Sequence, residues 1–166
     1  MVFLFSVQFL YVRVLFQKRA CDYVKPDSNF FASGQCLGYQ LEKGLELTKD
    51  ICYPSAEQIL EQTKTFVEKH QPTVLFVAAD GDAMIDQFKK TLGIKVIQYA
   101  RSTGQSEGEA AHIDLYIISQ AKYAIVNCPS TFSAFAKRQR DVQEKPTDFW
   151  GIDNDKLATN EPNSEL

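Results

Sequence analysis

The sequence lacks the short motifs that identify several common classes of binding protein. It contains neither GxGxxG, the fingerprint of dinucleotide-binding domains, nor GxxxxGK[ST], the phosphate-binding loop of many nucleoside triphosphatases. Its four cysteines form no CxxC pair, and its two histidines, His70 and His112, stand far from any paired-cysteine spacing. We therefore expect no zinc site. The sequence also has no Asn-x-Ser/Thr glycosylation sequon.

An excess of basic residues is missing as well. The formal net charge of the 166 residues is −3 and the pI is near 5.4, so the composition does not indicate the basic surface that a nucleic-acid-binding protein needs. Glycine and proline are sparse, and 45% of the residues are hydrophobic against 23% charged. This composition is typical of a globular protein and excludes a disordered or collagen-like chain.

The longest hydrophobic run is too short to span a bilayer. Residues 1–12 contain only Ser6 and Gln8 as polar members, whereas a spanning helix needs ~20 apolar residues. The run has the length of a signal-peptide hydrophobic region but lacks a basic start and a small-residue cleavage site. Its aromatic and branched residues alternate as in a buried strand. Both interpretations, signal or anchor and buried strand, stay open, and we expect no membrane span.

The four cysteines, Cys21, Cys36, Cys52 and Cys128, are widely spaced. An even number at such spacing fits two disulfides in an oxidising compartment, and buried free thiols in a cytosolic protein fit equally well. Three of the four fall in residues 18–54, a glycine- and proline-containing segment with little periodicity. We predict that this segment is rich in loops.

From residue 55 onward, helical and strand patterns alternate. Ser55 and Gln58 have capping-box spacing before an amphipathic stretch that ends at Pro72. Asp82 is expected to cap a second helix that ends at Gly93. Further helices are expected over 110–121 and 130–141, and strands over 73–78, 94–99 and 123–126.

Such alternation predicts an α/β fold with a Rossmann-like parallel sheet flanked by helices. We expect one domain over residues 18–152 and a disordered tail over 153–166. Ligands of such sheets bind outside the carboxyl ends of the strands, often at helix N-termini.

Two turns qualify as ligand sites by this rule. After strand 73–78, Asp80 and Asp82 could contact a ribose or a metal, although capping explains Asp82 equally well. After strand 123–126, Ser130 and Thr131 place hydroxyls at a helix N-terminus, where a phosphate would bind. The structural alternative is that Ser130 only caps the helix.

Other polar residues have plain structural explanations. Lys137, Arg138 and Arg140 form the only basic cluster on a predicted helix. A solvated face is the simplest interpretation, and an ion pair of Arg140 with Asp141 is an alternative. His112 is two residues from Asp114, but a lone helical histidine is more often structural than catalytic.

Several strings, in one order over about residues 18–152, resemble the C-terminal half of the GDP-fucose protein O-fucosyltransferase family. They are RACD (19–22), FASGQCLGY (31–39), LTKDICYPS (47–55), VLFVAAD (74–80), DLYI (114–117), NCPSTF (127–132), KRQRD (137–141) and FWGI (149–152). Members of this family transfer fucose from GDP-fucose to Ser or Thr of EGF-like domains, as in Notch-type receptors.

The resemblance implies a fold and a donor site. The family has a GT-B fold of two Rossmann-like domains, and this chain would be the second. Ser130, Thr131 and Phe132 would hold the GDP phosphates and Asp114 the nucleoside. No metal or other cofactor is expected besides the donor GDP-fucose.

The resemblance also implies a compartment. It suggests the disulfides Cys21–Cys52 and Cys36–Cys128 and a place in the endoplasmic reticulum lumen. Residues 163–166, Asn-Ser-Glu-Leu, are a degenerate version of the family's retention signal.

The sequence departs from the family at its catalytic motif. The family's His-Leu-Arg reads Tyr11-Val12-Arg13 here, and Arg13 is out of register, so we assign no catalytic residue. We also expect the family's acceptor-side N-terminal domain to be missing, with residues 1–17 in place of the upstream sequence. We therefore expect a transferase portion that is inactive, or nearly so, by itself. The alternatives are a non-catalytic module that binds GDP or a GDP-sugar, and an unrelated cytosolic Rossmann-like enzyme with free thiols.

Overall fold

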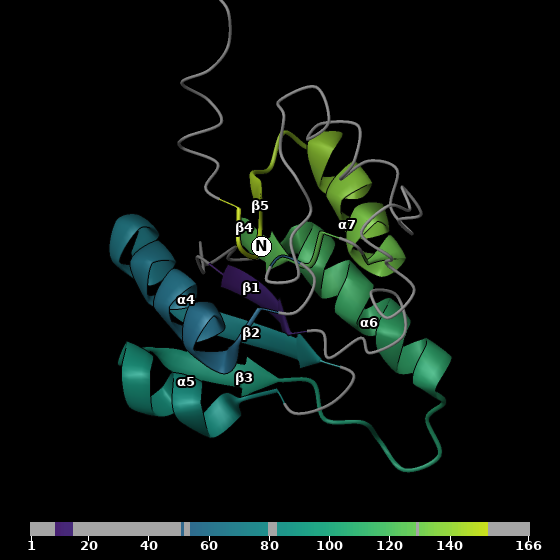
Figure 1. Ribbon diagram of the computed structural model, residues 1–166. Coiled ribbons are helices and arrows are strands. Elements are labelled where there is room, and N and C mark those ends of the chain that lie inside the picture. The colour runs from purple at the N-terminus through teal and green to yellow at the C-terminus, as the bar shows by residue number, and fades with distance from the viewer. Residues whose placement is uncertain (1–8, 15–50, 52–53, 80–82, 129, 153–166) are drawn as a thin grey trace, which may run out of the picture.

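The computed structural model describes residues 9–14, 51, 54–79, 83–128 and 130–152. In this part of the chain, helices surround a five-stranded parallel sheet with strand order β3-β2-β1-β4-β5 (Figure 1). The strands are β1 (Phe9–Val14), β2 (Val74–Ala79), β3 (Lys95–Gln98), β4 (Tyr123–Val126) and β5 (Thr147–Phe149). The helices are α4 (Ala56–His70), α5 (Ile85–Leu92), α6 (Glu107–Gln120) and α7 (Thr131–Asp141). The predicted Rossmann-like parallel sheet is confirmed.

The hydrophobic N-terminal run supplies the central strand of this sheet. Leu10 of β1 is in register with Leu75 of β2 on one side and with Tyr123 of β4 on the other. The strand interpretation is therefore confirmed for Phe9–Val14. The domain start expected at residue 18 lies after a strand that belongs to the same sheet. Residues 1–8, the cysteine-containing segment 18–50 and the tail 153–166 lie outside the described residues.

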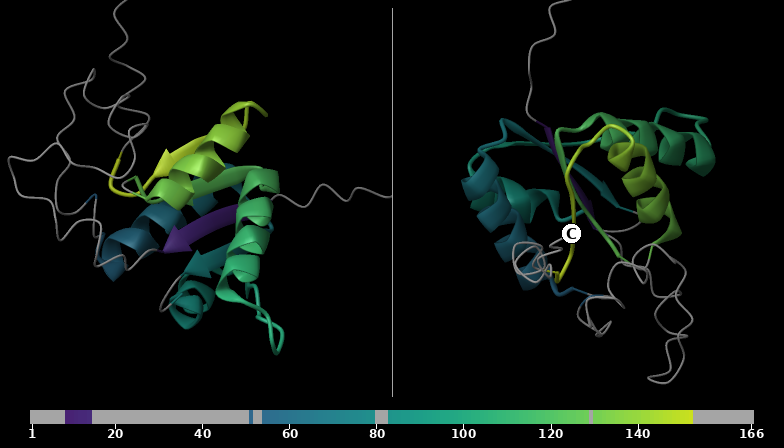
Figure 2. Two further views of the ribbon diagram at one scale, coloured as in Figure 1. Left: turned by 90° about the vertical axis from the view of Figure 1, so that its right-hand side faces the viewer. Right: turned by 90° about the horizontal axis from the view of Figure 1, so that it is seen from above.

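The helices cover both faces of the sheet. Figures 1 and 2 show α4 and α5 on one face and α6 and α7 on the other. Strand β2 divides its side chains accordingly: Leu75 and Val77 join the core beneath α4 and α5, and Phe76 and Ala78 join the core beneath α6 and α7. A continuous apolar run is what a strand buried on both faces requires. None of the described helices combines the length and apolar composition needed to cross a membrane.

Helix α4 begins and ends as expected. Gln58 N donates to Ser55 Oγ at 3.2 Å, and Ser55 N donates to Gln58 Oε1 at 2.7 Å, which confirms the predicted capping box. The helix ends at Gln71 in the left-handed conformation, directly before Pro72.

Two other helix starts differ from the prediction. Met84, and not Asp82, is the N-cap residue of α5, and its own side chain makes no capping hydrogen bond; Asp80 and Asp82 lie outside the described residues. Helix α6 begins at Glu107, three residues before the expected 110. A second capping box, Ser106 with Glu109, explains the early start and was overlooked in the sequence.

Strand β5 was not predicted, and contacts from both sides hold it. Trp150 N donates to Val126 O at 3.1 Å, and the Trp150 side chain is fully buried. From α4, Gln62 Nε2 donates to Phe149 O at 3.0 Å, and Gly151 N donates to Gln62 Oε1 at 3.0 Å. The Gln62 amide therefore pairs with the main chain at β5 as a neighbouring strand would.

Candidate functional site

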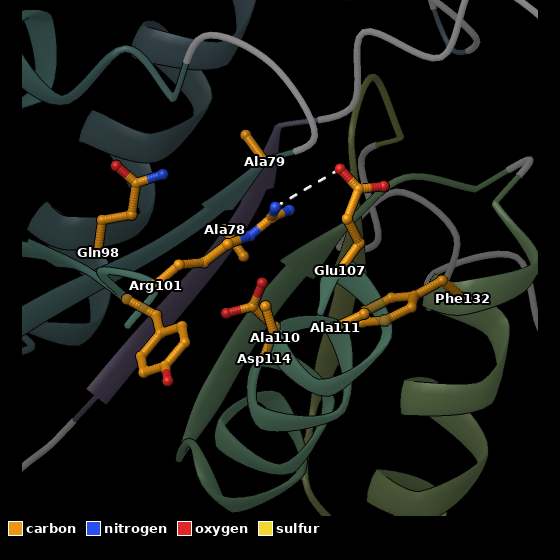
Figure 3. Close-up of a pocket in the computed structure, with 10 residues that line it drawn as sticks. Ala78, Ala79, Gln98, Arg101, Glu107, Ala110, Ala111, Asp114 and Phe132 are labelled. Carbon is orange, nitrogen blue, oxygen red and sulfur yellow. Dashed lines mark hydrogen bonds and ion pairs between the residues drawn. The ribbon is translucent and has the colours of Figure 1, made fainter. Parts of the chain in front are cut away.

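A pocket of about 290 Å³ opens where β2 and β3 end and α6 begins. This is the edge at which parallel sheets bind ligands, and the strand order 3-2-1-4-5 reverses direction next to it, between β1 and β4. Among the described residues, ten line the pocket (Figure 3): Ala78, Ala79, Gln98, Tyr99, Arg101, Glu107, Ala110, Ala111, Asp114 and Phe132.

Small side chains from two elements leave the space open. Ala78 and Ala79 end β2, and Ala110 and Ala111 lie in the first turns of α6. The aromatic rings of Tyr99 and Phe132 complete the lining. The polar side chains of Gln98, Arg101, Glu107 and Asp114 also face this space, so the lining is mixed and not purely apolar.

Two of the four residues predicted to bind the nucleotide line this pocket. Asp114, in α6, and Phe132, in α7, both line it and both are half-buried. In Figure 3 the Asp114 carboxylate lies between Arg101 and Phe132. Ser130 and Thr131 are not among the lining residues, but they directly precede Phe132. The structure therefore brings the four residues to one place, and their roles remain predictions.

The start of α7 confirms the capping interpretation of Ser130. Ser130 Oγ accepts a hydrogen bond from Ser133 N at 3.3 Å, and the residue is 2% exposed. Capping uses a lone pair of Oγ, so the hydroxyl hydrogen can still be donated to a ligand. Thr131 is exposed at the same helix end. The capping and phosphate-binding interpretations of Ser130 are compatible with each other.

Cys128 lies two residues before this helix and is buried at 1% exposure. It forms a disulfide whose other half lies outside the described residues. Near it, Ser130 N donates to Asn127 O at 3.3 Å, which closes a turn between β4 and α7. A covalent link and a closed turn both restrict the position of the α7 N-terminus.

Arg101 and Glu107 were overlooked in the sequence. Arg101 Nη1 lies 3.5 Å from Glu107 Oε1, and their side chains are 53% and 90% exposed. Arg101 follows β3 and Glu107 is the first residue of α6, so the fold, and not a motif, joins them. Among the described lining residues, this pocket has one cation, Arg101, and two carboxylates, Glu107 and Asp114.

The basic cluster of α7 is not a uniformly solvated face. Arg138 is exposed, but Arg140 is fully buried, and Asp141 pairs with Lys137 at 2.6 Å. The solvated-face interpretation was wrong for Arg140, whereas the charge of Asp141 does act on Arg140 by partly opposing the effect of burial on its pKa. Its guanidinium instead binds main-chain carbonyls at the end of α6. Burial lowers the pKa of Arg140 to about 10, so it is charged at neutral pH.

Neither histidine lies at the pocket. The exposed His112 ring contacts Gly108 O through Nδ1 at 2.7 Å, which is a local contact within α6. His70 packs against the rings of Phe66 and Tyr123. Within the described ranges, no three His, Cys, Asp or Glu side chains converge as ligands for a metal ion.

Comparisons with known proteins place the chain in a family. The family model of GDP-fucose protein O-fucosyltransferase matches residues 12–143. The match begins within β1, earlier than the expected start near residue 18. GDP-fucose protein O-fucosyltransferase 1 of Caenorhabditis elegans is 37% identical over 139 residues, which are 81% of this chain and 34% of the relative.

Solved structures agree with the sequence match. The crystal structure of POFUT1 in complex with GDP-fucose is 34% identical, with a TM-score of 0.73 over 88% of this chain and 42% of that one. A GDP complex of POFUT1 gives the same TM-score and identity, over 87% and 43% of the two chains. The chain thus spans about a third to two fifths of these relatives. On this sequence match and this likeness of structure, the chain belongs to the GDP-fucose protein O-fucosyltransferase family.

Proposed function

We propose that this chain is the donor-binding portion of a protein O-fucosyltransferase and binds GDP-fucose at the pocket between β2, β3, α6 and α7. The observation that carries the proposal is a pocket next to a helix N-terminus in a chain whose solved relatives bind GDP or GDP-fucose. The pocket at the carboxyl ends of the strands adjoins the α7 N-terminus, and the matching POFUT1 structures hold GDP or GDP-fucose. Of the four residues expected to bind nucleotide, Asp114 and Phe132 line this pocket, and Ser130 and Thr131 directly precede Phe132.

The chemistry of the site fits the parts of the donor. The first amides of α7 point out of a positive helix end, where an anion gains about 0.3–1 kcal/mol at an exposed site. Thr131 is exposed there and the Ser130 hydroxyl retains its hydrogen, so both can donate to phosphate oxygens. Asp114 can accept hydrogen bonds from ribose hydroxyls. In this proposal the positive helix end and hydrogen bonds from the two hydroxyls stabilise the diphosphate without a metal.

Transfer needs a group that this sequence does not carry. The family's catalytic arginine belongs to a His-Leu-Arg motif, which does not occur among the 166 residues. Stabilising a developing charge with one preorganised donor is worth roughly 3–4 kcal/mol, or ~10²–10³ in rate. We therefore expect the chain alone to bind the donor without transferring fucose to Ser or Thr of EGF-like acceptors, such as those of Notch-type receptors. A non-catalytic module that binds GDP or a GDP-sugar is the second candidate, favoured by the same missing motif.

The endoplasmic reticulum lumen is the proposed compartment. Cys128 is in a disulfide, and the family pattern pairs it with Cys36 and pairs Cys21 with Cys52. Disulfides persist in that oxidising compartment. Titration of the denatured, non-reduced chain should find no free thiol. Four free thiols would contradict both disulfides and the proposed compartment.

Calorimetric titration with GDP-fucose tests the donor site. Wild type should bind with a measurable heat, and Thr131→Ala should bind about tenfold more weakly, because an exposed hydroxyl donor to phosphate is lost. Ser133→Ala is the matched control, since it removes another hydroxyl of the same helix turn and should leave affinity unchanged. Equal affinity of wild type and Thr131→Ala, or no binding by wild type, would contradict the proposed site.

A transfer assay tests the catalytic part of the proposal. The purified chain, GDP-fucose and a folded EGF-like domain are incubated, and fucosylated product is counted by mass spectrometry. We expect no product above a control without the chain. Product above that control would show that the chain carries a catalyst of its own.

A further inference from the structure

The residues expected to bind the donor belong to two different helices. Asp114 is in α6, whereas Ser130 and Thr131 form the start of α7. Both helices cover the same face of the sheet (Figures 1 and 2). A nucleotide that contacts both helices therefore binds well only if α7 lies at one fixed angle to α6. The groups that set this angle consequently affect donor binding without touching the donor.

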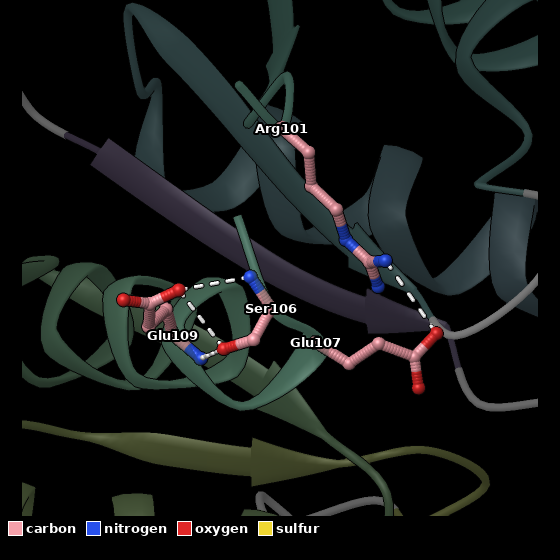
Figure 4. Close-up of polar contacts among 4 residues, drawn as sticks. All are labelled: Arg101, Ser106, Glu107 and Glu109. Carbon is pink, nitrogen blue, oxygen red and sulfur yellow. Dashed lines mark hydrogen bonds and ion pairs between the residues drawn. The ribbon is translucent and has the colours of Figure 1, made fainter. Parts of the chain in front are cut away.

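Helix α6 is held at both of its ends. At its start, Ser106 N and Oγ donate to Glu109 Oε2 at 2.8 and 2.9 Å (Figure 4). At its other end, the carbonyl groups of residues 118–121 have no partner within the helix. Arg140 donates to the first and the last of these carbonyls, and Lys145 donates to the two between them. Helix α6 thus forms a fixed frame against which α7 packs.

The inner face of α7 offers little interlocking of side chains. The buried residues of this helix are Ser133, Ala134, Ala136 and Arg140. Helices interlock by packing ridges of side chains into grooves, and serine and alanine form only low ridges. Arg140 is the one large side chain among these four. It therefore supplies most of the directional contact between this face of α7 and its surroundings.

Every N–H donor of Arg140 is used. Nη1 makes its two bonds to the end of α6, both at 2.7 Å. Nη2 donates to Lys122 O at 3.2 Å and to Pro146 O at 2.6 Å, and Nε donates to Thr147 Oγ1 at 2.8 Å. A guanidinium carries its donors in one rigid plane, so these bonds fix a direction as well as a position. They hold the end of α7 against α6 and against the segment that leads into β5.

The start of α7 is held differently, by a turn. Ser130 N donates to Asn127 O at 3.3 Å, and Cys128 within this turn is in a disulfide. Without the bonds of Arg140, the helix is free to swing about the turn. The first amides of a helix point along its axis, and a hydrogen bond weakens as it departs from a straight line. A swing of the axis therefore turns these amides away from a bound phosphate.

We propose that Arg140 is a positioning residue for donor binding, because it ties the end of α7 to the end of α6 and so aims the α7 N-terminus at the diphosphate. Arg140 does not line the pocket. It lies nine residues after Thr131, which is roughly 14 Å along a helix. The effect falls on the phosphate end of the nucleotide, since Asp114 is in the helix that stays held. This inference rests on the proposed function.

Titration of the full chain with GDP and with guanosine, followed by amide NMR so that weak binding is also measured, tests this role. Arg140→Lys keeps the charge but not the planar donors. It should weaken GDP about tenfold and leave guanosine, which has no phosphate, unchanged. Lys145→Met is the matched control, because it frees two carbonyls at the same end of α6 but leaves the guanidinium in place. Gln62→Leu is a second control, which loses stability at β5. Neither control should change either affinity.

The outcomes separate this inference from the proposed function. Equal GDP affinity in wild type and Arg140→Lys, or an equal loss for GDP and guanosine, overturns the inference while the donor site stands. A loss of GDP affinity as large in Gln62→Leu also overturns it, because lower stability then explains the effect. If wild type binds no GDP, the proposed function fails together with the inference.

A milder variant covers the case in which Arg140→Lys does not fold. Thr147→Val removes only the acceptor of Arg140 Nε. It should weaken GDP about threefold and leave guanosine unchanged. An unchanged GDP affinity in this variant would then overturn the inference. Circular dichroism below the melting temperature of each variant shows that the protein titrated is folded.

Discussion

Arg140 Nη1 donates a hydrogen bond to the main-chain oxygen of Ala121 at 2.7 Å, joining the end of α7 to the end of α6. The same nitrogen donates to Ile118 O at 2.7 Å. The remaining donors reach Pro146 O and Lys122 O through Nη2 and Thr147 Oγ1 through Nε. The last carbonyls of a helix have no partner within the helix and carry partial negative charge, which a buried cation complements. Arg140 therefore fixes α7, whose other end meets the pocket.

Replacing Arg140 by methionine should destabilise the fold by roughly 3–5 kcal/mol, since it leaves several buried carbonyls without a donor. The stability of Arg140→Lys should lie between those of wild type and Arg140→Met, because an ammonium keeps the charge but cannot reproduce the planar set of donors of a guanidinium. Urea denaturation measures both. Arg138→Met, at an exposed position of the same helix, is the control and should be nearly neutral. A loss below about 1 kcal/mol for Arg140→Met would contradict this role.

Ser133→Ala should leave stability unchanged or raise it by up to about 1 kcal/mol. Ser133 Oγ is buried and has no hydrogen-bond partner among the described residues, whereas Ser133 N keeps its bond to the Ser130 cap in the variant. Ser130→Ala should instead cost about 1 kcal/mol, because the cap is lost. Thermal unfolding of the two variants compares these effects. Clear destabilisation by Ser133→Ala would show that its hydroxyl has a partner.

The Ser106–Glu109 capping box should make stability depend on pH. Main-chain and side-chain hydrogen bonds from Ser106 lower the pKa of Glu109 below 4.5. As pH falls, Glu109 is therefore protonated in the unfolded chain before it is protonated in the folded chain. The stabilisation by the ionised Glu109 is present above about pH 4.5 and is lost as pH falls through the pKa of Glu109 in the folded chain. Wild type should exceed Glu109→Gln in stability at pH 7, and the difference should shrink in acid. An equal loss of stability with falling pH in wild type and in Glu109→Gln would show that Glu109 does not cause the pH dependence.

Gln62→Leu should destabilise the β5 edge by about 1–3 kcal/mol, because Phe149 O and Gly151 N both lose their partner. The exposed Gln87 of α5 offers a control, Gln87→Leu, with no expected effect. Hydrogen exchange at Gly151 should become faster in the Gln62 variant only. Unchanged exchange would show that the Gln62 amide does not hold this edge.

Local patterns predicted the elements whose signals lie within a few residues. The Ser55 capping box, the Gly93 helix end and the apolar β2 run follow from contacts within one element, and the structure confirms them. The Ser106–Glu109 box was equally readable from its spacing. The start of α5 could not be predicted in this way, because its N-cap, Met84, is in the left-handed conformation and makes no side-chain capping hydrogen bond.

Long-range contacts set the features that the sequence could not predict. The partners of Arg140 in and after α6 lie 18 to 22 residues away, and no periodicity marks them. The same holds for Arg101 and Glu107, which meet only because β3 ends beside α6. Asp114 and Phe132 were found through family resemblance, since spacing alone does not bring them to one pocket. The central place of β1 likewise depends on pairing with β2 and β4.

The most direct test of the nucleotide site is a two-dimensional amide NMR spectrum of the ¹⁵N-labelled chain during titration with GDP. The account predicts saturable shifts for amides that surround the pocket, among them Ala79, Asp114, Thr131 and Phe132. It predicts little change in α4 and α5, which cover the opposite face of the sheet. Shifts confined to α4 and α5, or no saturable shift at all, would contradict a donor site at the start of α7.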